Sequence, residues 1–112
     1  MRVLFLRPHS SIPSSAPPTG LLSLTSYLRK YGDYEITIFD GRAYMTPTEQ
    51  VKPLIKQHKP DVVGITAFSP EQREAHELAE LSKELFPGIP VIMGGPYTTS
   101  QWAKVLADEN VD

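Results

Sequence analysis

The residues best suited to chemistry are two adjacent glycines, Gly94 and Gly95, within the stretch PVIMGGPYTT at 90–99. They end an apolar run of the kind that forms a buried strand. Glycine adopts positive φ readily and leaves backbone uncovered. The pair therefore predicts either a tight turn or a surface on which a flat part of a ligand can lie. In the second case, Tyr97 and Thr98 would border the ligand.

A second candidate is Asp40, which follows another strand-like run and opens the loop DGRAYMT with Arg42 close by. An acid at this place can bind a ribose hydroxyl in nucleotide-binding folds. However, no G-x-G-x-x-G follows the first apolar run, and no G-x-x-x-x-G-K-[ST] occurs anywhere. A nucleotide or flavin site is therefore kept only as an alternative.

A third candidate group is Thr66, Phe68 and Ser69, at the end of the apolar run DVVGIT. A phospho-acceptor domain would need an acid here, so that function is disfavoured. Ser69 is predicted to cap the next helix, because serine accepts backbone N–H groups well and Glu71 in the first turn suits the helix dipole.

Metal binding and nucleophilic catalysis find little support among the remaining side chains. The chain has no cysteine, which excludes disulfides, thiolate metal ligands and a cysteine nucleophile. His9 lies in the long loop RPHSSIPSSAPPTG, where it could act as a ligand or acid–base group or belong to a proline-stiffened cover. His58 and His76 are predicted to be solvated or partly packed on helices. No catalytic residue and no metal site are predicted.

The elements that must position these residues alternate between strand and helix patterns. Apolar runs predict strands at 3–6, 34–39, 61–66 and 90–93. Helical spacing of apolar residues predicts helices over 21–31, across 51–58 with Pro53 either in the first turn of a helix starting near Lys52 or at a kink in a longer one, over 70–86, and around 102–106. This order predicts one α/β domain over 1–112: a Rossmann-like, flavodoxin-type open parallel sheet of order 2-1-3-4, with helices on both faces.

Further expectations concern partners and the ends of the chain. The net charge of −2 gives no basic excess for nucleic acid, and no apolar run is long enough to cross a membrane. With no secretory signal pattern, a cytoplasmic location is expected. Val111 resembles the first residue of a fifth strand that is missing or truncated. We therefore expect a fragment or leading domain of a longer protein, and an exposed strand edge through which two copies could pair.

Taken in order, MRVLFLRP, PPTGLLSLTSYLRKYG, YEITIFDGR, KPDVVGITAFSPE and PVIMGGPYTT resemble a known family across the whole chain. It is the cobalamin (vitamin B12)-binding domain at the front of cobalamin-dependent radical S-adenosylmethionine enzymes. That family includes anaerobic magnesium-protoporphyrin IX monomethyl ester cyclase and many methyltransferases. The resemblance implies a Rossmann-like fold, and a corrinoid as cofactor.

The resemblance carries site residues over by motif. Related cobalamin domains use D-x-H-x-x-G, S-x-L and G-G, in which the histidine binds cobalt. Here Asp40 matches the aspartate, but Arg42 replaces the histidine and Met45 replaces the glycine. Arginine is not a plausible cobalt ligand. It would contact the corrin's amides or tail phosphate, or be a surface charge. Thr66-Ala67-Phe68 matches S-x-L by residue type, and Gly94-Gly95 matches in full.

The resemblance implies that this chain positions cobalamin for methyl transfer or cyclase-type radical chemistry. The cobalamin-binding residues would be Asp40, Arg42, Thr66, Phe68, Ser69, Gly94, Gly95, Tyr97 and Thr98. A C-terminal radical S-adenosylmethionine domain, absent from this chain, would hold the 4Fe-4S iron-sulfur cluster and S-adenosylmethionine. One alternative is a domain of the same descent that has lost its cofactor and serves docking or substrate gating.

Overall fold

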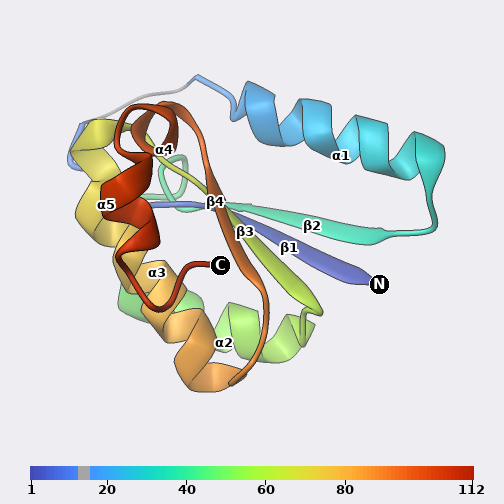
Figure 1. The fold of residues 1–112 in the computed structure, drawn as a ribbon. Helices are drawn as coiled ribbons and strands as arrows, with labels where there is room; N and C mark the ends of the chain where they lie inside the picture. Colours follow the sequence, from blue (N-terminus) through green and yellow to red (C-terminus); the bar gives the residue numbers. More distant parts are fainter. Residues whose placement is uncertain (13–15) are drawn as a thin grey trace.

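The computed structural model describes residues 1–12 and 16–112, which form a single parallel sheet with helices on both faces (Figure 1). The sheet order is β2-β1-β3-β4, as predicted, with β2 at one edge. The strands are β1 (Arg2–Arg7), β2 (Glu35–Asp40), β3 (Val62–Thr66) and β4 (Val91–Gly94). All neighbouring strands run parallel, as expected when each connection is a helical crossover.

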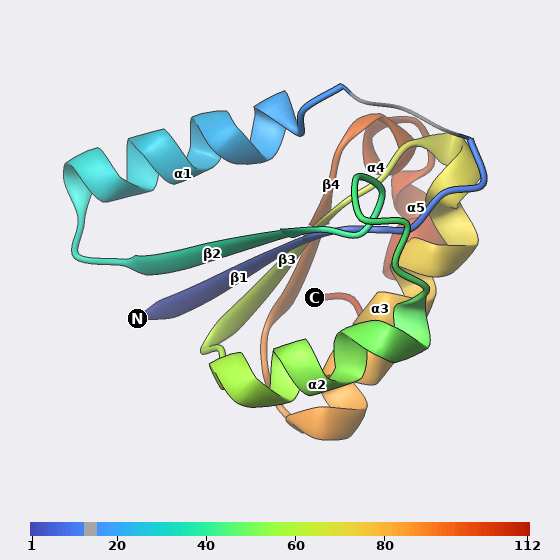
Figure 2. The ribbon, with the colours of Figure 1, turned by 180° about the vertical axis from the view of Figure 1, so that it is seen from behind.

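The helices divide unevenly between the two faces. Helix α1 (Thr19–Tyr31) lies on one face, whereas α2 (Thr48–His58), α3 (Gln72–Leu85) and α5 (Trp102–Leu106) gather on the other (Figures 1 and 2). The 3-10 turn η1 (Ser69–Glu71) leads into α3, and α4 (Pro96–Ser100) follows β4. Among the described elements, α1 is thus the only helix on its face of the sheet.

Strand alternation creates two hydrophobic cores. Leu4 and Leu6 of β1 belong to the larger core, together with Ile55 of α2 and Leu78 of α3. Val3 and Phe5 face the other way and pack with Leu21 of α1 and Ile36 of β2. Because side chains alternate along a strand, every second residue of β1 and β3 faces α1. This places the side chains of Arg7 and Thr66 on the face that α1 covers.

Two local predictions are wrong, and a third is decided between its alternatives. Ser69 does not cap α3, because it is itself the first residue of η1 and α3 begins at Gln72. The segment after Gly95, which was expected to be loop, is the short helix α4, favoured by a proline at its first position. For Pro53, the structure decides between the two alternatives: it is the sixth residue of α2, at an exposed position, so it lies inside a longer helix and not in a first turn.

At the open edge of β4, where a fifth strand would pair, Asp112 makes two hydrogen bonds to Val91. The backbone N–H of Asp112 donates to the carbonyl of Val91 at 2.9 Å. The Asp112 carboxylate accepts the Val91 N–H at 2.8 Å. Asp112 therefore provides hydrogen-bond partners for the backbone N–H and carbonyl of Val91, at the start of the open edge of β4. Pro13, one of the prolines expected to stiffen the first loop, lies outside the described residues.

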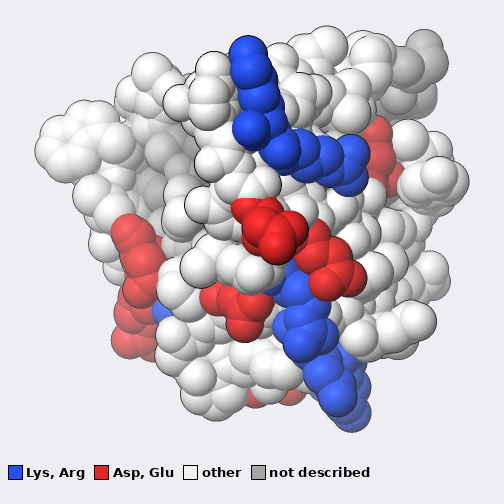
Figure 3. Space-filling model, turned by 90° about the vertical axis from the view of Figure 1, so that its right-hand side faces the viewer, with Lys and Arg blue, Asp and Glu red and all other residues white. Residues whose placement is uncertain are grey.

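Surface charge is mixed at the end of the molecule where the strands begin. Figure 3 shows acidic side chains lying between basic ones there, without a broad field of one sign. This agrees with the small net charge of −2. Within the described residues, no helix has the length and apolar character needed to cross a bilayer.

Candidate functional site

The carboxyl ends of the strands meet at one edge of the sheet and bring the predicted site residues together. Arg7 pairs in register with Asp40, and Thr66 pairs with Gly94. A cavity of about 480 Å³ lies between this edge and the start of α1. Its lining includes Arg7, Arg42, Thr66, Phe68, Gly95 and the first turn of α1. Its volume is in the range of small-molecule sites, and its position is the usual one for ligands of open parallel sheets.

Gly95 is required by the fold itself. Its φ is +97°, a conformation that side chains other than glycine rarely adopt. A Cβ there would lie 2.8 Å from the Ala67 carbonyl oxygen and 2.9 Å from Thr66 Oγ1. The Tyr97 N–H also donates to the Ala67 carbonyl at 3.1 Å. For Gly95, the tight-turn interpretation is therefore sufficient.

Gly94 differs from its neighbour. Its φ is not positive, and a Cβ built on it would meet no described atom within 4 Å. It is the last residue of β4, and the preceding Met93 points into the larger core. Alternation therefore directs the missing side chain of Gly94 toward the α1 face. The fold does not need glycine here, so the open space is available to a ligand.

Asp40 organises the loop that follows β2. Its Oδ2 accepts a hydrogen bond from Arg7 at 3.1 Å. Its Oδ1 accepts the backbone N–H groups of Arg42 and Ala43 at 3.1 and 3.0 Å. Arg7, only 5% exposed, also donates to the carbonyl of Ala16 at 2.8 Å. Asp40 is thus occupied by the protein itself, which leaves it poorly placed to bind a ribose.

The Arg42 side chain is mostly buried and lies close to the buried carboxyl group of Glu71. Its side chain is only 12% exposed, and its terminal nitrogen lies 3.8 Å from Glu71 Oε2. Its Nε donates to the Ile12 carbonyl at 3.3 Å. Glu71 is 1% exposed, and burial raises its pKa against the opposing charges of Arg42 and Arg7. Sequence reasoning missed Glu71, which it placed at the exposed start of a helix.

The remaining predicted residues fall into two groups. Thr66 and Phe68 line the cavity, whereas Ser69 is exposed on η1 and does not. Thr98 donates to the Gly94 carbonyl at 3.4 Å and so braces the turn from α4. Tyr97 points away from the cavity into the larger core. Of the predicted set, then, Arg42, Thr66, Phe68 and Gly95 face the cavity directly.

The histidines do not form a metal centre. His9 is half-buried, and its Nδ1 has no hydrogen-bond partner among the described residues. His76 contacts Tyr97 and Asp108, a network that the sequence pattern did not reveal. In residues 1–12 and 16–112, no group of three His, Asp or Glu side chains is arranged to hold a metal ion.

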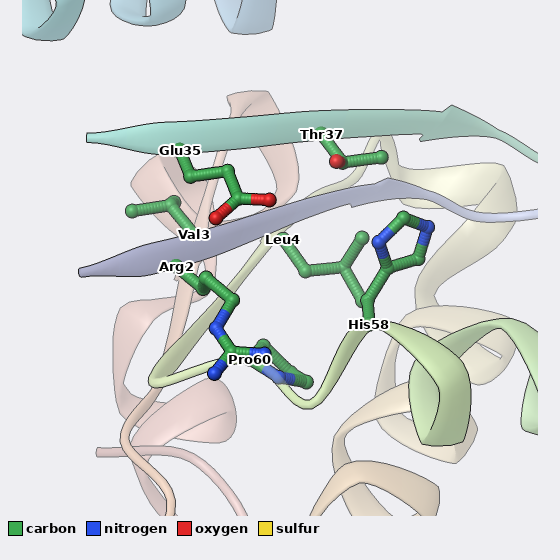
Figure 4. A pocket seen from close by; sticks show the side chains of 7 residues that line it. All are labelled: Arg2, Val3, Leu4, Glu35, Thr37, His58 and Pro60. Carbon is green, nitrogen blue, oxygen red and sulfur yellow. The ribbon is translucent and has the colours of Figure 1, made fainter.

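A second hollow lies at the opposite end of the sheet, between β1, β2 and the end of α2 (Figure 4). Figure 4 shows Glu35, Thr37 and His58 around it. Its volume is only about 10 Å³, which is room for roughly one water molecule. This hollow cannot hold a cofactor, so the carboxyl-edge cavity is the candidate site.

Comparison with known proteins gives matches over nearly the whole chain. The chain is 31% identical to an anaerobic magnesium-protoporphyrin IX monomethyl ester cyclase of Rubrivivax gelatinosus and 26% identical to one of Cereibacter sphaeroides, with 96% of the chain covered in both. It is 30% identical to an uncharacterized methyltransferase of Pyrococcus horikoshii over 88% of the chain. The matches cover 20%, 18% and 22% of those proteins, so the chain spans about a fifth of their length.

A protein-family model supplies the assignment. The model of the B12 binding domain matches residues 9–112, which include most of the first loop, the carboxyl ends of β2, β3 and β4, and both glycines. The matched range contains every residue that lines the cavity except Arg7. The chain therefore belongs to the B12 binding domain family.

Proposed function

We propose that this chain binds cobalamin at the carboxyl edge of its sheet, with part of the corrinoid in the cavity and part against the open backbone of Gly94. The observation that carries the proposal is the contrast between the two glycines. Gly95 is explained by backbone geometry and close contacts, whereas Gly94 opens onto space that nothing in the described structure fills. A strand end without a side chain is what a flat ligand needs in order to approach the backbone closely.

The cavity lining suits such a ligand chemically. Phe68 and the first turn of α1 offer apolar and backbone surface, while Thr66 supplies a hydroxyl. Arg42 supplies a guanidinium whose donors match amide or phosphate oxygens. When bound, cobalamin would supply cobalt-centred reactivity, and the protein's contribution would be to position it and limit access of water.

The replacement of histidine by Arg42 bears on how cobalt would be held. Arginine stays protonated and has no lone pair to offer a metal. The Arg42 side chain is also engaged by the Ile12 carbonyl and the Glu71 carboxylate. We therefore propose that the loop after β2 supplies no lower ligand, and that cobalamin is retained through contacts to its periphery.

The chemistry would be completed by parts of a longer protein. The relatives are about five times the length of the matched region, and their names are those of a cyclase and a methyltransferase. We propose that a radical S-adenosylmethionine domain, with its 4Fe-4S cluster, works with this chain in methyl transfer or cyclase-type radical chemistry. The 112 residues would then act as one cobalamin-binding domain without catalysing a reaction alone.

A cofactor-free docking module is the second candidate, favoured by exposed apolar side chains at the same edge. Tyr44, Met45 and Phe68 are all exposed there. Such residues mark interaction surfaces when they gather on one side of a protein. This candidate would require the protein to fold normally without retaining any corrinoid.

The deciding experiment measures retention of hydroxocobalamin by the purified full-length protein, from the visible spectrum after desalting. We expect a retained corrinoid band in the wild type and its loss in Gly94→Val, because the added side chain enters the ligand's space. The matched control is Ile92→Val, which changes an exposed residue on the same strand and face.

Thermal melts of the same samples show whether each variant is folded. A wild type that is folded but carries no corrinoid after desalting would refute cobalamin binding and support the docking module. Normal retention by Gly94→Val would show instead that the ligand does not lie against this backbone.

A further inference from the structure

A chain of three polar side chains runs beneath the turn that carries the two glycines. The Tyr97 hydroxyl lies 3.0 Å from His76 Nε2, and His76 Nδ1 lies 2.5 Å from Asp108 Oδ2. The Tyr97 and His76 rings also meet edge to face, with centroids 5.8 Å apart. Tyr97 lies on α4, His76 on α3 and Asp108 in the turn after α5. Their hydrogen bonds therefore connect elements that are distant in sequence.

The donor and the acceptor in the contact between His76 and Asp108 can be assigned from the other hydrogen bonds of Asp108. Asp108 also accepts the backbone N–H and side-chain amide of Asn110, at 2.9 and 3.0 Å. These contacts are those of an ionised carboxylate, which can only accept. His76 Nδ1 therefore carries a proton, and in the tautomer that leaves Nε2 unprotonated, Nε2 accepts from the Tyr97 hydroxyl. Asp108 thus fixes the tautomer that His76 needs in order to hold Tyr97.

Tyr97 transmits this anchoring to the cavity wall. It is 1% exposed and stands two residues after Gly95. Its backbone N–H binds the Ala67 carbonyl, while the Ala67 N–H binds the Gly94 carbonyl. Gly95 and Pro96 both line the cavity. A shift of the Tyr97 ring would therefore move the backbone that forms one wall of the site.

We infer that Tyr97 and His76 are positioning residues that hold the turn 94–97 in its binding-competent place, with Asp108 orienting His76. The inference rests on the proposed function, because it assumes that cobalamin binds against this turn. It assigns no contact between these three side chains and the ligand. Their effect on binding passes through the backbone of Gly95 and Pro96.

The test compares substitutions that keep or remove the Tyr97–His76 hydrogen bond. Tyr97→Phe retains the buried ring but loses the bond, and should weaken hydroxocobalamin binding about fivefold, which corresponds to one net hydrogen bond. His76→Asn keeps a donor near Asp108 but is too short for Tyr97, and should weaken it equally. His76→Gln reaches Tyr97 and should bind within about twofold of wild type.

The matched control is Ser82→Ala, which removes a different buried hydrogen bond of α3, from Ser82 to the Leu78 carbonyl at 2.7 Å. It should lower stability without changing affinity. Hydrogen exchange gives a readout that needs no cofactor. In Tyr97→Phe and His76→Asn, but not in Ser82→Ala, the amides of Tyr97 and Thr99 should exchange about fivefold faster.

These outcomes separate the inference from the proposed function. If the wild type retains no corrinoid, cobalamin binding fails, and the exchange of the two amides alone decides whether this network holds the turn. If the wild type binds but His76→Asn and His76→Gln weaken binding equally, the positioning role is wrong while cobalamin binding stands. Unchanged amide exchange in Tyr97→Phe would also overturn the inference.

Discussion

Gly94, the last residue of β4, and Gly95, which follows it, should respond differently to the same substitution. In Gly95→Ala, the new methyl group would lie 2.8 Å from the Ala67 carbonyl oxygen, 2.9 Å from Thr66 Oγ1 and 3.0 Å from Ala67 N. Two of these atoms belong to the backbone of a neighbouring segment, so they cannot move aside as a flexible side chain would. The residue would also keep a φ near +97°.

Both costs can be placed on a scale. A non-glycine residue held in a sparsely populated backbone region costs about 1–3 kcal/mol. Forcing an extra carbon into well-packed surroundings costs about another 1–3 kcal/mol. Gly95→Ala should therefore lower the free energy of unfolding by about 2–6 kcal/mol, a large share of the roughly 5–15 kcal/mol typical of a domain.

Gly94→Ala is the internal comparison. Its methyl group meets no described atom within 4 Å, and its φ is not positive. The substitution should change stability by less than about 1 kcal/mol and could raise it, because alanine reduces the entropy of the unfolded chain. Urea unfolding followed by circular dichroism measures both variants. Equal destabilisation by the two substitutions, or a Gly95→Ala effect below about 0.5 kcal/mol, would refute the assignment of the structural role to Gly95.

Other measurements address the charged groups. Arg7→Ala should lower the free energy of unfolding by about 3–5 kcal/mol, because it leaves the Asp40 carboxylate without its buried partner; a loss under 1 kcal/mol in urea unfolding would contradict this. Burial alone would raise the pKa of Asp108, but hydrogen bonds from Asn110 and His76 bring it below the usual value. Its stabilising contribution is therefore present above the unfolded pKa of about 3.9 and is lost as pH falls through the lower folded value. Thermal melts should show this acid loss reduced in Asp108→Asn, and an unaltered profile would count against it. Reduced cobalamin on wild-type protein should give an electron paramagnetic resonance spectrum that is unaffected by ¹⁵N labelling of histidine, since Arg42 occupies the histidine position of the motif; a labelling effect would reveal a histidine ligand.

The fold was predictable from sequence because its main determinants are local and repeat along the chain. Apolar runs of strand length alternate with helical spacing, and this alternation implies parallel pairing and right-handed crossovers. The edge position of β2 followed from the flavodoxin-type strand order 2-1-3-4, and the structure confirms it. The same reasoning placed Asp40, Thr66 and Gly94 at one edge of the sheet, where they lie.

Several features of the site could not be read from sequence because they depend on contacts between distant segments. Glu71 was expected on an exposed first turn, but η1 turns it inward toward Arg42. His76 and Asp108 are 32 residues apart and form no spacing motif. The helix α4 was missed because its threonines favour strand or loop, although Pro96 directly after Gly95 is a start signal that could have been used.

The solitary position of α1 has a consequence for how the cavity can change its width. Only Leu21 and Thr25 of this helix are buried, while Leu24, Tyr27 and Tyr31 are exposed. Segments with few buried contacts open at a lower free energy than the core strands they cover. One wall of the cavity, the turn at Gly95, is bound to β3, and the other is the start of this weakly anchored helix. We therefore expect that movement of α1 would widen the cavity at less cost to the sheet than movement of the turn at Gly95.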